Sequence, residues 1–104
     1  MRPVKFQPIV EWEIDRACAR YTEQDVAEVV ARLLEEIDRA VAQLEGFAHM
    51  YSAVDSTESG FAVRRIRLWT FPFMLVYVID PSDVVQVFAF AHLKQERFWR
   101  HRVP

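Results

Sequence analysis

Apolar residues gather in three short runs over the second half of the chain, at residues 61–69, 71–79 and 84–91. Each run is rich in Val, Ile and Phe, and turn-forming residues separate it from the next, a pattern typical of consecutive β-strands. The segment Asp80-Pro81-Ser82-Asp83 joins the last two runs, and so short a connection with Pro and Asp favours a hairpin over a crossover helix. The pattern therefore predicts an antiparallel meander.

The last of these runs predicts a strand with two different faces, because successive side chains of a strand point to opposite sides. One face would carry the small apolar residues Val85, Val87, Ala89 and Ala91, and the other would carry Gln86, Phe88, Phe90 and His92. We expect the smaller face to pack against helices. The other face leads into residues 94–100, and we expect the working surface of the protein there.

The first half of the chain begins with a short strand and then changes to a helical period. Val4 and Phe6 alternate with polar residues between Pro3 and Pro8, which predicts an edge strand. From Ile9, apolar residues at helical spacing predict a first helix of about three turns; they are Val10, Ile14, Ala17, Cys18 and Tyr21.

A second and longer helix is predicted from Thr22 to about Leu44. The segment Thr22-Glu23-Gln24-Asp25 resembles a capping box, with Tyr21 and Val26 placed as a hydrophobic staple. An unbroken apolar stripe follows, and Gly46 is predicted to end the helix in a left-handed conformation. Because so little chain joins the two helices, they are expected to form an antiparallel hairpin. Residues 47–59 show no period and predict a loop.

Together these elements predict one α+β domain over residues 1–104. Its expected architecture is an N-terminal strand, then an antiparallel helical hairpin packed on one face of an antiparallel β-sheet meander. A chain of 104 residues is long enough for one hydrophobic core but not for two.

Charge is unevenly distributed between the two halves of the chain. Residues 1–59 hold 6 Lys/Arg and 12 Asp/Glu, a net charge of −6, whereas residues 60–104 hold 7 and 3, a net charge of +4. Such a local basic region suits an acidic protein partner as well as RNA.

Cys18 is the sole cysteine, which excludes an internal disulfide and fits a reducing compartment. No signal peptide or membrane span is apparent, so a cytoplasmic protein without membrane partners is expected.

No established catalytic motif, metal site or cofactor site is apparent, so the candidate chemistry rests on isolated residues. Arg65 and Arg67 share one face of a predicted strand and could clamp phosphate or carboxylate, although a solvated outer face is the favoured interpretation. His92 could act as a general acid or base, with a structural histidine as the favoured alternative.

Aromatic residues near the end of the chain are candidates for contact with a partner. Phe88, Phe90, Phe98 and Trp99 could stack on bases, but a core or protein-binding role is favoured. Phe98 and Trp99 stand beside Arg97, Arg100 and Arg102, a mixture typical of an aromatic anchor with a charged rim.

In order and in motifs, nearly the whole chain resembles the RelE/ParE superfamily of type II toxin–antitoxin toxins. Phe71-Pro72-Phe73 followed by Tyr77 is similar to the Phe-Pro-Tyr strand of the family and its downstream Tyr. Ala89-Phe90-Ala91-His92, leading to Trp99 and Arg102, is similar to its Ala-x-Ala-His strand end and Tyr-Trp-x-x-Arg tail. Arg65 or Arg67 falls where members carry a strand arginine.

Two departures from the family pattern bear on function. Met74 stands where RNA-cleaving members carry a central-strand arginine, which favours the ParE branch, whose known members poison DNA gyrase without cutting RNA. After the histidine, Lys94-Gln95-Glu96-Arg97 replaces the usual Arg-x-Pro, and the tail is one residue shorter.

The resemblance implies a toxin that binds a target such as DNA gyrase and is neutralised by a cognate antitoxin. One alternative is a ribosome-dependent mRNA interferase that would use Arg65, Arg67, His92 and Lys94. Another is a non-toxic relic that serves as a protein-binding module. The residues expected to contact a partner are Arg65, Arg67, Phe88, Phe90, Arg97, Phe98, Trp99 and Arg100.

Overall fold

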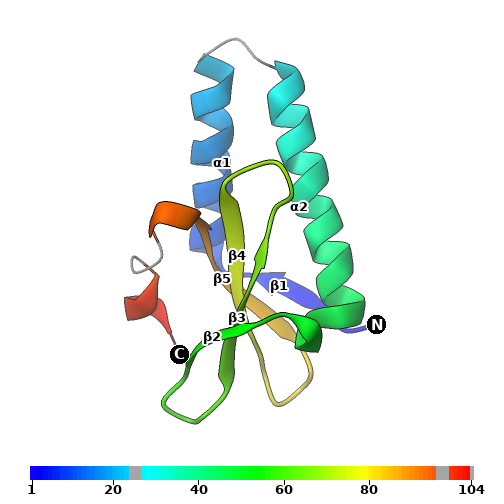
Figure 1. The fold of residues 1–104 in the computed structure, drawn as a ribbon, viewed down its shortest axis with the longest axis vertical. Helices are drawn as coiled ribbons and strands as arrows, with labels where there is room; N and C mark the ends of the chain where they lie inside the picture. The colour runs from blue at the N-terminus through cyan, green and yellow to red at the C-terminus, as the bar shows by residue number, and fades with distance from the viewer. Residues whose placement is uncertain (24–26, 96–98, 104) are drawn as a thin grey trace.

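Five strands form one mixed sheet, and two helices pack beside it as a hairpin (Figure 1). The structure is a computed structural model that describes residues 1–23, 27–95 and 99–103. The strands are β1 (Val4–Phe6), β2 (Ala53–Ser56), β3 (Ala62–Arg67), β4 (Phe73–Ile79) and β5 (Val85–His92), in the order β1-β5-β4-β3-β2. The helices are α1 (Pro8–Glu23) and α2 (Ala27–Phe47).

The predicted α+β architecture is confirmed, including the antiparallel meander of β3, β4 and β5. β1 lies at the edge of the sheet, as its flanking prolines indicate, and it pairs with β5 in a parallel direction. At the β4–β5 turn, the Asp80 carboxylate accepts hydrogen bonds from the backbone amides of Ser82 and Val84. Asp83 in the same turn adopts a left-handed φ of 63°. Side-chain capping of this kind closes a short hairpin.

The helical hairpin covers one face of the sheet and builds the larger core. The apolar stripe of α2 supplies Leu33, Ile37 and Leu44, and α1 supplies Val10 and Ile14. These side chains pack on alternate residues of the central strands, among them Leu75, Tyr77, Val85 and Val87. The apolar side chains that recur every 3.6 residues in the helices therefore pack against those that recur every second residue in the strands, in one buried layer.

Both predicted boundaries at the ends of α2 differ from the structure. Thr22 lies in the last turn of α1, where its hydroxyl donates to the Cys18 carbonyl at 3.0 Å, so it does not cap the second helix. The rest of the predicted capping box and staple, at residues 24–26, lies outside the described residues. Gly46 is also not a left-handed stop, because α2 runs on to Phe47 and into a 3₁₀ turn at Ala48–Met50.

The prediction of a loop over residues 47–59 is wrong in part, because Ala53–Ser56 forms the edge strand β2. Of its four side chains, Val54 alone packs against a core cluster, and Ala53, Asp55 and Ser56 are exposed. A strand with one anchoring side chain shows no alternation in sequence, which is why the pattern missed it.

A β-bulge in β5 inverts the predicted faces of that strand. Val76 pairs with Ala89, but the next residue, Tyr77, pairs with Val87, so Phe88 is an extra residue in β5. Before the bulge Val85 and Val87 face the helices, as predicted. After it, Ala89 and Ala91 turn away from the helices and Phe90 turns toward them, opposite to the prediction.

The sheet face opposite the helices carries a second, smaller core under the C-terminal segment. Trp99, only 2% exposed, packs there with Phe88 at 6.0 Å between ring centroids, and with Val63, Met74 and Ala91. Trp99 therefore anchors the C-terminal segment on the sheet. The described residues of this segment form 3₁₀ turns at Leu93–Gln95 and Arg100–Arg102. No helix in the described parts of the chain is long and apolar enough to cross a membrane.

Candidate functional site

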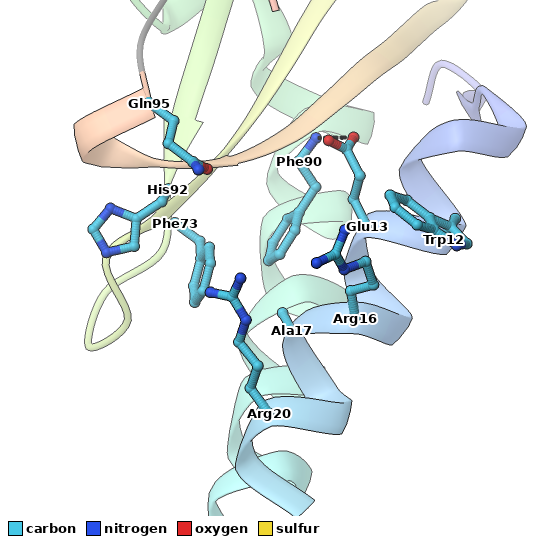
Figure 2. A pocket seen from close by; sticks show the side chains of 9 residues that line it. All are labelled: Trp12, Glu13, Arg16, Ala17, Arg20, Phe73, Phe90, His92 and Gln95. Carbon is cyan, nitrogen blue, oxygen red and sulfur yellow. Dashed lines mark hydrogen bonds between the residues drawn. The ribbon is translucent and has the colours of Figure 1, made fainter. Parts of the chain in front are cut away.

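A pocket of about 210 Å³ opens between α1 and the ends of β4 and β5 (Figure 2). Its lining combines charged side chains of the helix with aromatic side chains of the sheet: Trp12, Glu13, Arg16, Ala17, Arg20, Phe73, Phe90, His92 and Gln95. The pocket depends on the β-bulge, because only the inverted face of β5 directs Phe90 and His92 toward the helix.

Three aromatic rings from the sheet form the floor of the pocket. Phe73 stacks on Phe90 with 4.9 Å between ring centroids. The His92 ring packs edge-on against the same Phe73 ring, with 5.5 Å between centroids. The Lys94 amide donates to Nδ1 of His92 at 3.0 Å, so in this arrangement the imidazole carries its proton on Nε2. The floor is therefore aromatic and largely apolar, with one polar donor at its edge.

Arginines of α1 form the opposite wall. Trp12, Arg16 and Arg20 are spaced four residues apart, which places them along one face of the helix. The Arg16 guanidinium lies 4.8 Å from the Trp12 ring centroid, a cation–π contact at the exposed rim. Arg16 and Arg20 extend toward the rings of Phe73 and Phe90 (Figure 2). Neither arginine forms a hydrogen bond or an ion pair with any residue that the structure describes.

The carboxylate in the lining, Glu13, is already engaged. It accepts from Nη1 of Arg102 at 2.9 Å and from the Phe90 amide at 3.2 Å, and its side chain is 8% exposed. Arg102 thus neutralises Glu13 within the domain. The charge that remains on the helix wall of the pocket is positive.

The four residues considered for RNA cleavage do not meet at one place. Arg67 pairs with Met74, and Arg65 with Val76, on the face of the sheet that points away from the helices. His92 pairs with Phe73 on the helix face, and the Lys94 side chain is exposed beyond the strand end. Arg65, whose Nη1 lies 3.9 Å from the Met74 sulfur, and His92 therefore flank opposite sides of the sheet.

The residues expected to contact a partner are also divided between environments. Phe88, Phe90 and Trp99 are at most 4% exposed and belong to the two cores. Arg67 and Arg100 are exposed, and Arg65 is half-buried. Arg97 and Phe98 lie outside the described residues.

Trp12, Arg16 and Arg20 were not singled out from the sequence, although their four-residue spacing is visible there. What the sequence could not provide is the position of Phe90 and His92, which the bulge moves to the same side. For the described residues, no group of three His, Cys, Asp or Glu side chains is placed to hold a metal ion.

Comparison with solved structures identifies the class of fold. The chain superposes on a chain of the solved structure titled "Chromosomal ParDE TA system from P. aeruginosa", with a TM-score of 0.72 and 16% sequence identity. The match covers 88% of this chain and 96% of the chain in that structure. The fold is therefore one that occurs in a toxin–antitoxin system.

The family assignment comes from the sequence. The family model for the ParE toxin of type II toxin–antitoxin systems, parDE, matches residues 4–97. This chain belongs to the ParE toxin family, which confirms the resemblance stated above. No match was found among curated proteins.

Proposed function

We propose that this type II toxin acts by binding a target protein, DNA gyrase, and that a cognate antitoxin neutralises it. Membership of the ParE family supports the proposal. The observation that carries it is that Arg65 and Arg67 lie on the opposite sheet face from His92. Cleavage of RNA requires groups that contact one phosphate and its ribose hydroxyl together, so this arrangement favours binding over cleavage.

Neutralisation by an antitoxin is supported by the charge and surface of the second half of the chain. Residues 60–104 carry a net charge of +4, with Arg67, Lys94 and Arg100 exposed. An acidic segment that folds on binding would be steered to this surface, and apolar contacts would supply most of its affinity.

Expression in bacteria, with and without the product of the adjacent reading frame, tests the proposal. We expect growth arrest when the chain is expressed alone and rescue when both are expressed. The purified chain should inhibit supercoiling by DNA gyrase, and the inhibition should be lost when the neighbouring product is added. A chain truncated before β5 is the matched control, because it lacks a central strand.

Two results would contradict the proposal. Primer extension on translated message that reveals new cuts in the ribosomal A-site codon would indicate an mRNA interferase. Normal growth on expression of the soluble chain alone would indicate a non-toxic binding module.

A further inference from the structure

The pocket beside α1 combines an apolar floor with two arginines that have no acidic partner among the described residues. Arg16 and Arg20 line it from the helix, and Phe73 and Phe90 stack beneath them (Figure 2). Guanidinium groups bind planar oxyanions through paired N–H donors. An anion bound here would also touch aromatic rings, so its charged group must sit on a short apolar stem.

The size of the pocket and the charge around it limit the ligand further. A volume of about 210 Å³ accommodates one side chain rather than a nucleotide chain. The helical half of the chain has a net charge of −6, with Glu11 and Asp15 exposed on α1 itself. A polyanion such as RNA would meet these carboxylates on its way past the pocket, whereas a single carboxylate would contact the arginines alone.

The rim of the pocket offers a second contact. Trp12 is 53% exposed, and the Arg16 guanidinium packs against one face of its ring. Large exposed aromatic side chains next to arginine are typical of positions that dominate protein interfaces. A polypeptide that places an acidic residue in the pocket would cover Trp12 with an apolar neighbour.

We propose that this pocket receives an Asp or Glu side chain of the antitoxin, bound by Arg16 and Arg20 and flanked by an apolar residue on Trp12. This inference rests on the proposed function, because the antitoxin supplies the carboxylate. The Nε2–H of His92 and the Gln95 amide are further donors at the pocket edge. Glu13 takes no part, since Arg102 and the Phe90 amide occupy it.

The first test uses the complex with the product of the adjacent reading frame. Arg16→Gln/Arg20→Gln should weaken the complex at least about tenfold, because a charge left unpaired in an interface raises the dissociation rate. Arg32→Gln, the same type of substitution at a single exposed position of α2, should leave the affinity unchanged. The melting temperatures of both variants should match that of the parent chain.

A double-mutant cycle identifies the partner carboxylate. Each Asp or Glu of the antitoxin is changed to Asn or Gln, and one change should weaken the parent complex but have no further effect on Arg16→Gln/Arg20→Gln. Unchanged affinity of the double-arginine variant would overturn the inference and leave the proposed function standing.

The second test examines the pocket without the partner. The free chain is titrated with 3-phenylpropionate, with the neutral 3-phenylpropanamide and with inorganic phosphate, followed by amide NMR shifts. Shifts at Arg16, Arg20 and Phe90 with the carboxylate, but not with the amide, would support the assignment. If no antitoxin complex forms, the proposed function fails, and this titration decides the pocket chemistry separately. No response to the carboxylate, or a response to phosphate alone, would overturn it.

Discussion

Glu13 on α1 and Arg102 in the last 3₁₀ turn, 89 residues apart in sequence, form an ion pair at 2.9 Å along the edge of β5. β1 bonds to this edge only as far as Val87, whose carbonyl accepts from Gln7. Beyond that point, Glu13 accepts from the Phe90 amide at 3.2 Å and Arg102 donates to the Phe88 carbonyl at 3.3 Å. The ion pair thus satisfies backbone groups that no strand reaches.

Removal of one member of this pair should destabilise the domain. Arg102→Met leaves the Glu13 charge buried and the Phe88 carbonyl without this donor, and we expect a loss of about 3 kcal/mol. Arg100→Met, at an exposed neighbouring position, is the control and should have little effect. Urea unfolding measures both variants. The double variant Glu13→Gln/Arg102→Met should lose less than the sum of its single changes, and strict additivity would contradict the pairing.

Glu36 should make stability depend on pH in the acid range. Burial opposes ionisation of this carboxyl most strongly, but hydrogen bonds from the Thr70 hydroxyl and amide and from Trp69, with the charge of Arg39, outweigh it and lower the pKa. Because the folded pKa lies below the unfolded one, the stabilisation is complete well above pH 4.5 and is lost as the pH falls.

Thr70→Val tests this prediction, because it removes the hydroxyl donor and keeps the shape. We expect a loss of about 1–2 kcal/mol at pH 7 and a smaller loss at an acid pH low enough to protonate the carboxyl. Glu35→Gln, an exposed neighbour, should leave the pH profile unchanged. An equal effect of Thr70→Val at both pH values would show that ionised Glu36 does not use this bond.

Trp99 should contribute more to stability than the exposed tryptophan of the β3–β4 connection. Trp99→Ala empties a site in the second core and should cost about 3–5 kcal/mol. Its Nε1 is buried and has no hydrogen-bond partner in the part of the chain that the structure describes, so Trp99→Phe should cost clearly less than the alanine change. Trp69→Ala, at 53% exposure, should cost under about 1 kcal/mol. Thermal unfolding provides the ranking, and equal losses at both positions would refute it.

The Tyr77 hydroxyl should join the sheet to the end of α2. It donates to the Ala48 carbonyl at 2.6 Å, and the residue is fully buried. Tyr77→Phe leaves that carbonyl without this donor, and we expect a loss of about 1–3 kcal/mol. Burial raises the pKa of the phenol, so the parent protein should also lose stability in alkali as the unfolded phenol ionises. Tyr77→Phe should unfold at a lower temperature at pH 7 and show a weaker alkaline loss.

The sequence predicted the elements that carry a helical apolar stripe or a long apolar run bounded by turn-forming residues. The α2 stripe through Leu33 and Leu44 and the runs that became β4 and β5 belong to this class. β2 was missed because Val54 is its one anchoring side chain, so it leaves no periodic trace. Gly46 was wrongly predicted as the helix stop because its permissive backbone is also compatible with an ordinary helical turn. The helix continues to Phe47, and the carbonyl of the next residue, Ala48, accepts a hydrogen bond from the Tyr77 hydroxyl.

The candidate site could be predicted only in part, because one extra residue decides which side chains share a face. Alternation assigns Phe90 and Ala91 correctly relative to each other, but a bulge at Phe88 reverses both relative to Val87. Bulges depend on pairing with the neighbouring strand and not on local propensity. The four-residue spacing of the arginines on α1 is visible in the sequence. It predicts a pocket only when Phe90 and His92 are known to lie opposite these arginines.

The parallel pairing of β1 with β5 has a consequence for synthesis of the toxin. Val4 leaves the ribosome well before its partner in the sheet, Val85, has been synthesised. Contacts so distant in sequence form slowly, because the intervening chain must be ordered first. Until β5 has emerged, the apolar stripe of α2 has no complete sheet to cover it, and a nascent or prematurely released fragment exposes that stripe to chaperones and proteases. Translation to the end of β5 is thus a condition for the native fold to form, because β5 is a central strand of the sheet.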